Sequence, residues 1–327
     1  MGNTVVALPT VAALAEYFLH GVDLIVDERW AGIAEGVAGV TVRPMRVRGA
    51  GRERGLIGQV KAFAQMLALR GKYDVAIDLT GTKRGNLAAW CTRAKRRVGQ
   101  AWSERAWCFT DLVPGRRDVH CLELYGQMLA CVGRPSTPGA VRLMASAASR
   151  ERVAAVLPDG PFVVIHPCAG KAYREWPADR FATVAAGLHE AHGLACVVIG
   201  ASGDRATVDA LFTALPDAVP RSFVTVKPAD LVAVFERAAL LLSNESGPTH
   251  IAAATNVPIV TIFGPTPEAR WRPIRDDGIA VLRGGDCDPA CGRRQCVVGN
   301  RCLRELSVDT VMEHAAALAA DRVRISS

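Results

Sequence analysis

Short apolar runs rich in β-branched residues alternate with helix-like segments along the whole chain, and this alternation restricts the fold more than any other feature. Runs that are apolar on both faces are typical of parallel strands covered by helices on both sides. The pattern therefore predicts an α/β protein with parallel sheets. The strand-like runs are VDLIV (22–26), YDVAIDL (73–79), FVVIHP (162–167), ACVVIGA (195–201), ALLLSN (239–244), VPIVTIFG (257–264) and IAVLR (279–283).

The chain is long enough for two domains. It has 327 residues, half of them hydrophobic, and roughly 150 residues make one ordinary domain. Four prolines surround a short helical stretch within residues 134–161, which indicates a linker between domains 1–150 and 151–327. Two doubly wound, Rossmann-like domains are expected to face a central cleft, because ligands of open α/β sheets bind beyond the carboxyl ends of the strands.

Neither a membrane span nor a signal peptide is expected. Apolar runs such as 194–201 are far shorter than the ~18 residues that a spanning helix needs. The N-terminus has no basic region, and Glu16 and His20 interrupt its apolar stretch, unlike a signal peptide. We therefore expect a cytoplasmic protein whose ten cysteines are reduced.

Charge is distributed unevenly between the two halves. Residues 1–150 contain 21 Lys and Arg against 12 Asp and Glu, whereas residues 151–327 contain 18 against 20. Basic clusters at 43–54 and 93–97 indicate either an acidic partner for the N-terminal half or simply solvated faces. Nucleic acid is the less favoured partner, because no basic strand with interleaved aromatic residues is visible.

The segment SNESGPTHIAAA (243–254) follows an apolar strand and opens a helix. Ser246 is a candidate N-cap, Gly247 permits close backbone approach, and Pro248 suits the first turn. Free N–H groups at such a helix start can bind phosphate. The same strand, turn and helix also occur in folds without any ligand there.

Two further loops follow predicted strands. HPCAGKAYREWPADRFA (166–182) presents Arg174, a residue type that can hold a diphosphate bidentately; alternatively, this is a surface loop with Trp176 packed against the helix. In VVIGASGDRAT (197–207), Asp204 is a candidate acceptor for a ribose hydroxyl.

Together these segments resemble glycosyltransferase family 9, the ADP-heptose:lipopolysaccharide heptosyltransferases. The resemblance includes YDVAIDLTG and RAKRRVG in the N-terminal half, and SNESGPTHIAAATNVPIVTIFGPT and CLRELSVDTV in the C-terminal half. It implies a GT-B-like fold with an N-terminal acceptor domain and a C-terminal nucleotide-sugar domain. It also implies inverting transfer with no required metal or other cofactor.

The resemblance also implies roles for individual residues. Glu245 stands where the family has an acid that contacts the donor sugar, and Arg174 stands at a phosphate-binding lysine position. Asp204 lies near the ribose-binding acid, and Arg84 takes the place of a basic residue that faces the acceptor. The expected diphosphate loop comprises Ser246, Gly247, Thr249 and His250.

The chain departs from the family pattern at its N-terminus. Family members begin with an apolar strand that leads into a Gly-Asp turn, but here the first strand is missing and Asn3 takes the place of the general base. Either the start of the chain is assigned too late, or the fold closes differently at that edge. An amide cannot accept the proton of an acceptor hydroxyl at neutral pH. Asp78 is a tentative alternative base; it also fits a buried acid that caps the following loop.

Four cysteines near the C-terminus have the spacing C-x3-C-x4-C-x5-C. Four thiolates can bind zinc, but the paired C-x2-C knuckles of strong zinc sites are missing. A structural zinc site and a structural role without metal therefore both stay open for Cys287, Cys291, Cys296 and Cys302.

The sequence predicts an inverting glycosyltransferase that moves a sugar, heptose from ADP-heptose by resemblance, to an anionic glycolipid of the lipopolysaccharide-core type. The acceptor would be presented at the inner face of the inner membrane. The alternative is a non-catalytic relative that binds nucleotide or a partner as a scaffold, which Asn3 and the missing strand favour. Nothing in the pattern specifies an oligomeric state.

Overall fold

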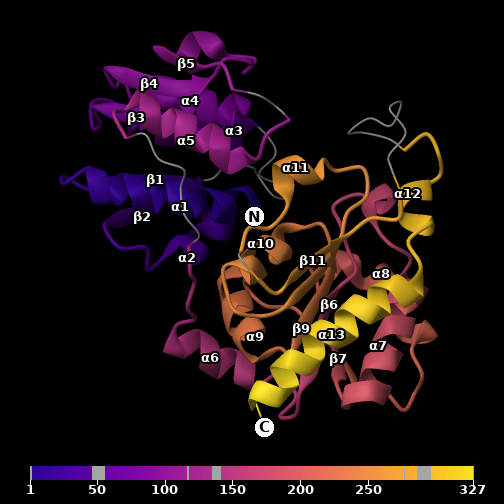
Figure 1. Cartoon of the computed structure of the whole chain (residues 1–327). Coiled ribbons are helices and arrows are strands. Elements are labelled where there is room, and N and C mark those ends of the chain that lie inside the picture. Colours follow the sequence, from indigo (N-terminus) through magenta and orange to yellow (C-terminus); the bar gives the residue numbers. More distant parts are fainter. Residues whose placement is uncertain are drawn as a thin grey trace. The chain divides into compact units, whose positions relative to one another are not determined.

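A computed structural model describes residues 2–45, 56–115, 118–134, 141–275, 277–285 and 296–326. Within these ranges the protein is α/β, and all of its strand pairs are parallel (Figure 1). The chain forms two compact units: an N-terminal unit, Asn3–Val141, and a C-terminal unit, Arg142–Ser327, which also includes Met1–Gly2. The expected fold class, α/β with parallel sheets, is confirmed.

The division between the units falls after Val141, inside the predicted linker 134–161 and nine residues before the predicted domain bound at residue 150. Helix α6 (Ala147–Ala154) belongs to the C-terminal unit because its side chains bind there. Ser149 Oγ donates to Asp230 Oδ1 at 2.7 Å, and Arg152 forms an ion pair with the same carboxylate at 2.6 Å. The helical stretch inside the predicted linker is thus part of a folded unit.

The C-terminal unit is built on one six-stranded sheet with the order β11-β10-β9-β6-β7-β8. The first strand of the unit, β6, lies in the middle, and the chain builds outward from it in one direction before returning to the other. The strands are β6 (Phe162–His166), β7 (Ala195–Ile199), β8 (Arg221–Val224), β9 (Leu240–Asn244), β10 (Ile259–Ile262) and β11 (Ile279–Leu282). The helices are α7 (Ala178–His192), α8 (Arg205–Ala214), α9 (Leu231–Arg237), α10 (Gly247–Ala253), α11 (Glu268–Trp271), α12 (Arg301–Arg304) and α13 (Val308–Ser326).

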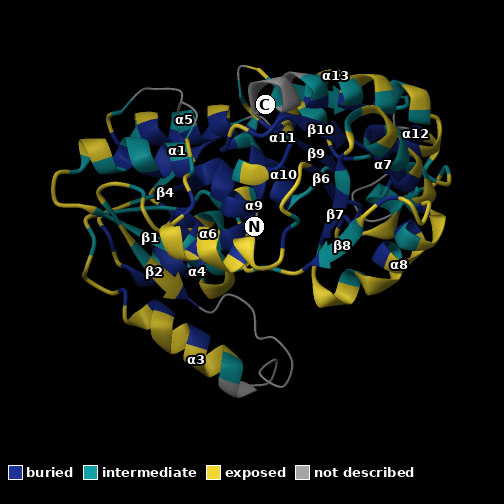
Figure 2. Ribbon diagram, turned by 90° about the horizontal axis from the view of Figure 1, so that it is seen from below, coloured by how far each residue is buried: buried dark blue, intermediate teal, exposed yellow. Residues whose placement is uncertain are grey.

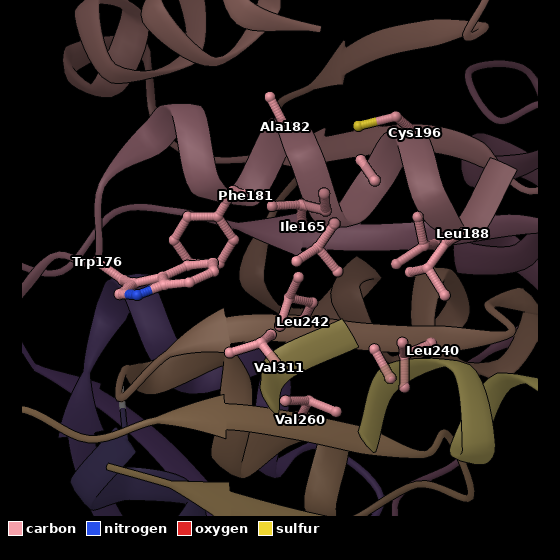
Figure 3. Packing of buried hydrophobic residues seen from close by; sticks show 14 of the residues in the cluster. Ile165, Trp176, Phe181, Ala182, Leu188, Cys196, Leu240, Leu242, Val260 and Val311 are labelled. Atoms are coloured by element: carbon pink, nitrogen blue, oxygen red, sulfur yellow. The ribbon is translucent and has the colours of Figure 1, made fainter. Parts of the chain in front are cut away.

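Burial on both faces explains why these strands have no alternation of polar and apolar residues. Every residue of β6, β9 and β10 is buried. One face of the sheet packs against α7 and α13, as Figure 3 shows for Ile165, Leu242 and Val260 of the strands with Leu188 and Val311 of those helices. Helix α7 ends at His192, and Gly193 caps it in the left-handed conformation, with a φ of 67°.

The N-terminal unit contains two smaller parallel sheets, β1-β2 and β3-β4-β5. The first sheet packs against α3 and α4, because Ile25 of β1 and Met45 of β2 lie in the same cluster as Met66, Ala88 and Cys91. Ala76 of β3 packs against a second cluster, formed by Ala89, Cys108 and Phe109. The strands are β1 (Val22–Asp27), β2 (Val40–Met45), β3 (Val75–Ile77), β4 (Arg96–Gln100) and β5 (Asp111–Val113). The helices are α1 (Gly2–Tyr17), α2 (Ala31–Ala34), α3 (Leu56–Leu67), α4 (Lys83–Cys91) and α5 (Cys121–Cys131).

A comparison of the two units bears on the predicted missing strand. In the C-terminal unit β6 joins β7-β8 on one side to β9-β10-β11 on the other. The N-terminal unit likewise has a group of two strands, β1-β2, followed in the chain by a group of three, β3-β4-β5. Its described residues contain no central strand that would join these two groups as β6 does. Most residues of β1 and all residues of β3 are accordingly only partly buried. Every residue of β6 and β9 is buried, and Figure 2 labels β1, β6 and β9 for comparison. In the described part of the chain, the first strand begins at Val22, after α1.

Among the helices that the structure describes, none combines the length and the apolar character that crossing a bilayer requires.

Candidate functional site

The strongest candidate site lies at the carboxyl ends of β6 and β9, within the C-terminal unit. These neighbouring strands are followed by connections that leave in opposite directions, since β6 leads to β7 and β9 leads to β10. Such a switch point leaves space above the sheet edge, where ligands of open α/β sheets bind. The two loops that flank this point are residues 167–176 and 245–246, and they carry most of the residues that the sequence indicated.

Asn244, which directly precedes the loop 245–246, forms hydrogen bonds with both ends of the loop 167–176. It is fully buried at the end of β9. Its Oδ1 accepts from the backbone N–H of Trp176 at 2.9 Å, and its Nδ2 donates to the carbonyl of Pro167 at 2.6 Å. The indole of Trp176 is buried as well, and its Nε1 donates to the carbonyl of Leu306 at 3.2 Å. The loop that carries Arg174 is therefore held at both ends, and Trp176 packs inward as one of the two sequence interpretations expected.

A cluster of hydroxyl groups lies at the start of α10. Ser246 occupies the N-cap position, but its side chain makes no capping bond to the helix backbone. Its Oγ instead lies 3.1 Å from His166 Nδ1 and 3.3 Å from Thr249 Oγ1. Thr249 Oγ1 also lies 3.0 Å from Ser243 Oγ and donates to the carbonyl of Asn244 at 3.3 Å. Ser246 and Thr249 are thus brought together as the diphosphate-loop prediction requires.

His166 ends the central strand β6 and is buried. Burial lowers the pKa of its imidazole to about 4, a shift only partly opposed by the negative charge of Asp204. The ring is therefore neutral at neutral pH, with one nitrogen that donates and one that accepts.

Glu245 and Arg174 come from the two different loops and interact electrostatically. Burial raises the pKa of the Glu245 carboxyl, while a hydrogen bond from Thr266 and the positive charge of Arg174 act in the opposite direction. Arg174 is half-buried, and its Nε is a buried donor with no hydrogen-bond partner among the described residues. An arginine with an unused buried donor beside a carboxyl group is suited to bind an additional anion.

The remaining predicted donor residues surround the same strand ends. Asp204 accepts from the backbone N–H of Ala201 at 2.7 Å, so its carboxylate stabilises its own turn, and ribose binding stays a prediction. Gly247 and His250 lie in α10, which has only seven residues; its dipole is correspondingly small. The phosphate role of this helix start also stays a prediction.

In the N-terminal unit, Asp78 organises the loop that follows β3. It is 5% exposed, and its Oδ1 accepts from the backbone N–H and the hydroxyl of Thr80 at 2.8 and 2.7 Å and from the N–H of Gly81 at 3.3 Å. Its Oδ2 accepts from Asn86 Nδ2 at 2.6 Å. A Cβ at Gly85 would lie 2.6 Å from Oδ1, so only glycine fits there. These contacts describe a loop cap, and the role as general base stays a prediction.

Arg84 and Asn3 both lie in the first turns of helices. Arg84 is half-buried in α4, two residues after the Thr82 N-cap. Asn3 is exposed in α1. No contact of either residue in the structure bears on acceptor binding or on proton transfer.

Comparison with known proteins identifies the family. A sequence model of glycosyltransferase family 9 (heptosyltransferase) matches residues 62–301, most of the chain. The chain belongs to glycosyltransferase family 9. The matched region includes Asp78 and Arg84 of the N-terminal unit as well as both loops at the switch point.

Individual relatives agree with this family 9 assignment. Lipopolysaccharide heptosyltransferase 3 of Escherichia coli K12 is 28% identical over 225 residues, which are 65% of this chain and 64% of that protein. The crystal structure of the family 9 glycosyl transferase from Veillonella parvula superposes with a TM-score of 0.81 at 21% identity, covering 98% of this chain and 94% of the other. E. coli heptosyltransferase WaaC with ADP-2-deoxy-2-fluoro heptose gives 0.69 at 20% identity, covering 95% of each chain. These solved structures support the GT-B-like fold.

The two basic clusters of this family 9 protein are partly engaged with its own fold. Arg43 pairs with Asp23, and Arg96 pairs with Asp111 at 2.8 Å. The guanidinium of Arg93 lies 4.2 Å from the ring centroid of Trp90, and Arg97 donates to two backbone carbonyls. The described members of these clusters therefore stabilise the N-terminal unit, and residues 46–55 lie outside the described ranges.

The cysteine cluster lies largely outside the described residues. Cys287 and Cys291 fall in the range 286–295, which the structure does not describe. Cys302 is buried, and Cys296 Sγ accepts from the backbone N–H of Asn300 at 3.0 Å. In the described part of the chain no group of three or more His, Cys, Asp or Glu side chains is arranged for a metal. Zinc binding by the four cysteines stays a prediction.

Two residues of this site were not assigned from the sequence: His166 and Asn244. Both stand at the carboxyl end of a strand that begins with a continuous apolar run, which is the signal that could have revealed them. A polar side chain buried at such a position must find hydrogen-bond partners, and here the partners are the loops of the site itself.

Proposed function

We propose that this protein transfers heptose from ADP-heptose to an anionic glycolipid acceptor of the lipopolysaccharide-core type, with inversion at the anomeric carbon. The observation that carries the proposal is the family 9 match, which spans both loops at the switch point. E. coli WaaC has been solved with an ADP-heptose analogue, and the curated E. coli relative is a lipopolysaccharide heptosyltransferase. The match covers slightly less than two thirds of that relative's length.

The C-terminal unit binds the donor in this proposal. Arg174 and the Ser246–Thr249 hydroxyls bind the diphosphate, which gains negative charge as the glycosidic bond breaks. Glu245 contacts the heptose, and Asp204 the ribose. The acceptor hydroxyl attacks the anomeric carbon from the opposite side, and the nucleoside diphosphate leaves. No metal ion is required, since cationic and hydroxyl side chains stabilise the leaving group.

The N-terminal unit binds the acceptor in this proposal, at the inner face of the inner membrane. Arg84 pairs with a phosphate or carboxylate of the glycolipid. Asp78 is the candidate general base, because the amide of Asn3 cannot take a proton from a hydroxyl.

Binding measurements on the full chain test the donor assignment. We expect Arg174→Ala to weaken ADP binding by about tenfold or more, because a charge-assisted hydrogen bond contributes roughly 1.5–3 kcal/mol. Adenosine should bind the variant as it binds the wild type. Arg205→Ala is the matched control, since Arg205 is an exposed arginine of the same unit, paired with Asp209 at 2.8 Å. Equal ADP affinities for Arg174→Ala and Arg205→Ala would contradict the donor assignment.

A non-catalytic scaffold is the second candidate, favoured by the exposed amide of Asn3. Release of ADP from ADP-heptose in the presence of a lipopolysaccharide-core acceptor separates the two functions. ADP binding without any acceptor-dependent release supports the scaffold, whereas acceptor-dependent release supports the transferase.

A further inference from the structure

His166 lies at the switch point, next to a residue that the proposed function assigns to ligand binding. Its ring lies at the end of the central strand, opposite Ser243 in the register with β9. Its Nδ1 is 3.1 Å from Ser246 Oγ, and Ser246 is one of the hydroxyl groups to which the proposed function gives a role in diphosphate binding. His166 itself is buried beneath that hydroxyl.

The protons of the hydroxyl cluster can be assigned by counting donors. A hydroxyl has one proton to donate. Thr249 donates its proton to the carbonyl of Asn244, so in its contact with Ser243, at 3.0 Å, Ser243 must be the donor. The proton of Ser246 then has three possible acceptors: Thr249 Oγ1, His166 Nδ1 or a ligand.

The tautomer of His166 decides among these acceptors. If Nδ1 has no proton, the contact with Ser246 requires Ser246 to donate to the imidazole, and the hydroxyl has no proton left for a ligand. If Nδ1 carries the proton, the imidazole donates to Ser246 Oγ, and the Ser246 hydroxyl is available as a donor. A phosphate oxygen can only accept hydrogen bonds, so an anion at Ser246 requires the second arrangement.

We propose that His166 is a positioning residue for the diphosphate of the donor: in its Nδ1–H tautomer it donates to Ser246 and directs the Ser246 hydroxyl to a phosphate oxygen. This inference rests on the proposed function, because it presumes a nucleoside diphosphate at the switch point. It adds a residue that makes no contact with the ligand and acts through Ser246. The burial that keeps the imidazole neutral leaves one ring N–H for this purpose.

A double-mutant cycle on ADP affinity tests the coupling. We expect His166→Phe and Ser246→Ala each to weaken ADP binding by about tenfold. The double variant should bind ADP no more weakly than Ser246→Ala, because His166 acts only by orienting the Ser246 hydroxyl, which that variant lacks. His166→Asn should recover part of the loss, because its amide N–H₂ can replace Nδ1–H. Adenosine, which has no phosphate, should bind all variants alike.

Two controls separate this role from general damage to the fold. His314→Asn changes an exposed histidine of α13 and should leave ADP affinity unchanged. Nitrogen-15 NMR of the wild-type imidazole needs no variant that might misfold; in the ADP complex, the shifts of His166 should report the Nδ1–H tautomer. An Nε2–H tautomer in that complex would overturn the inference, as would additive effects of the two single substitutions.

The result for the wild type distinguishes the failure of this inference from failure of the proposed function. If wild-type protein binds none of ADP, UDP and GDP, the donor assignment is wrong and the role of His166 is wrong with it. If ADP binds and Arg174→Ala weakens it, but the effects of His166→Phe and Ser246→Ala are independent, only the role of His166 is wrong.

Discussion

Asn244→Ala should destabilise the C-terminal unit strongly, although the residue contributes nothing to the apolar core. Its amide is the partner of two backbone groups, the N–H of Trp176 at 2.9 Å and the carbonyl of Pro167 at 2.6 Å. Asn244, Trp176 and Pro167 are all buried, so water cannot readily replace the lost amide. Both backbone groups would remain without a partner in the variant.

The magnitude follows from the cost of each unsatisfied group. A buried donor or acceptor that loses its partner costs about 1–3 kcal/mol, so two such groups predict a loss of about 2–6 kcal/mol in the free energy of unfolding. This is a large part of the roughly 5–15 kcal/mol that stabilises a typical domain. Asn244→Asp should be at least as costly at neutral pH, because it places a carboxylate oxygen against the Pro167 carbonyl.

Urea unfolding of the full chain, followed by tryptophan fluorescence, measures the effect. Asn256→Ala is the matched control, since Asn256 is an exposed asparagine of the same unit, and it should change stability by less than about 0.5 kcal/mol. Because Asn244 also anchors the loop that carries Arg174, ADP affinity should fall in Asn244→Ala. If Asn244→Ala is as stable as Asn256→Ala, the two hydrogen bonds do not hold this loop and the reasoning is refuted.

Three further predictions concern other parts of the chain. Arg84→Ala should lower acceptor kcat/KM by about tenfold or more while ADP affinity stays unchanged; loss of ADP affinity instead would place Arg84 on the donor side. Asp230→Asn should destabilise the protein at pH 7, because hydrogen bonds from Arg152 and Ser149 lower the pKa of the Asp230 carboxyl. A group with a lowered folded-state pKa stabilises above its unfolded pKa, about 3.9, so denaturation curves of the two proteins should converge as the pH falls below about 4. If a metal ion joins the four cysteines, protein purified without chelator should contain one zinc ion per chain by mass spectrometry. A spectrum without zinc would leave only a structural role without metal for Cys287, Cys291, Cys296 and Cys302.

The C-terminal sheet could be predicted from the sequence because most of its strands are buried on both faces. The runs that include Phe162–His166 and Leu240–Asn244 are continuously apolar up to their last residues, and the structure confirms both as strands. Three strands of the N-terminal unit were not predicted: β2, β4 and β5. Their residues, such as Arg96 and Arg97 of β4, are partly exposed and charged, so the apolar signal is missing.

The extent of the first helix shows a different limit. Helix α1 begins at Gly2 and contains Pro9. Local preferences argue against a helix there, since proline in a helix interior removes a hydrogen bond and clashes with the preceding turn. Burial of Val5, Val6, Leu8 and Val11 supplies a tertiary contribution that local sequence does not reveal.

For the site residues too, features set by neighbouring residues could be predicted from the sequence, whereas contacts between residues far apart in the chain could not. Ser246 as an N-cap residue and Pro248 in the first turn were readable from their order in the chain. The contact of Ser246 with His166 joins residues 80 positions apart, and the bond between Asn244 and Trp176 joins residues 68 apart. Such pairs depend on the strand order, which places β6 beside β9, and no local pattern specifies that order.

Asp78 and Glu245 show why burial alone does not identify the acid that takes part in chemistry. Burial raises the pKa of both carboxyl groups. Asp78 Oδ1 accepts from donors of its own loop, and Oδ2 accepts only from Asn86, so a hydroxyl that approaches this acid can use the second lone pair of Oδ2. Glu245 accepts from Thr266 and lies in the field of Arg174, whose Nε has no partner among the described residues. Asp78 thus combines the contacts of a loop cap with one acceptor site left on Oδ2, whereas the unused donor of Arg174 beside Glu245 agrees with the proposal that a diphosphate binds there.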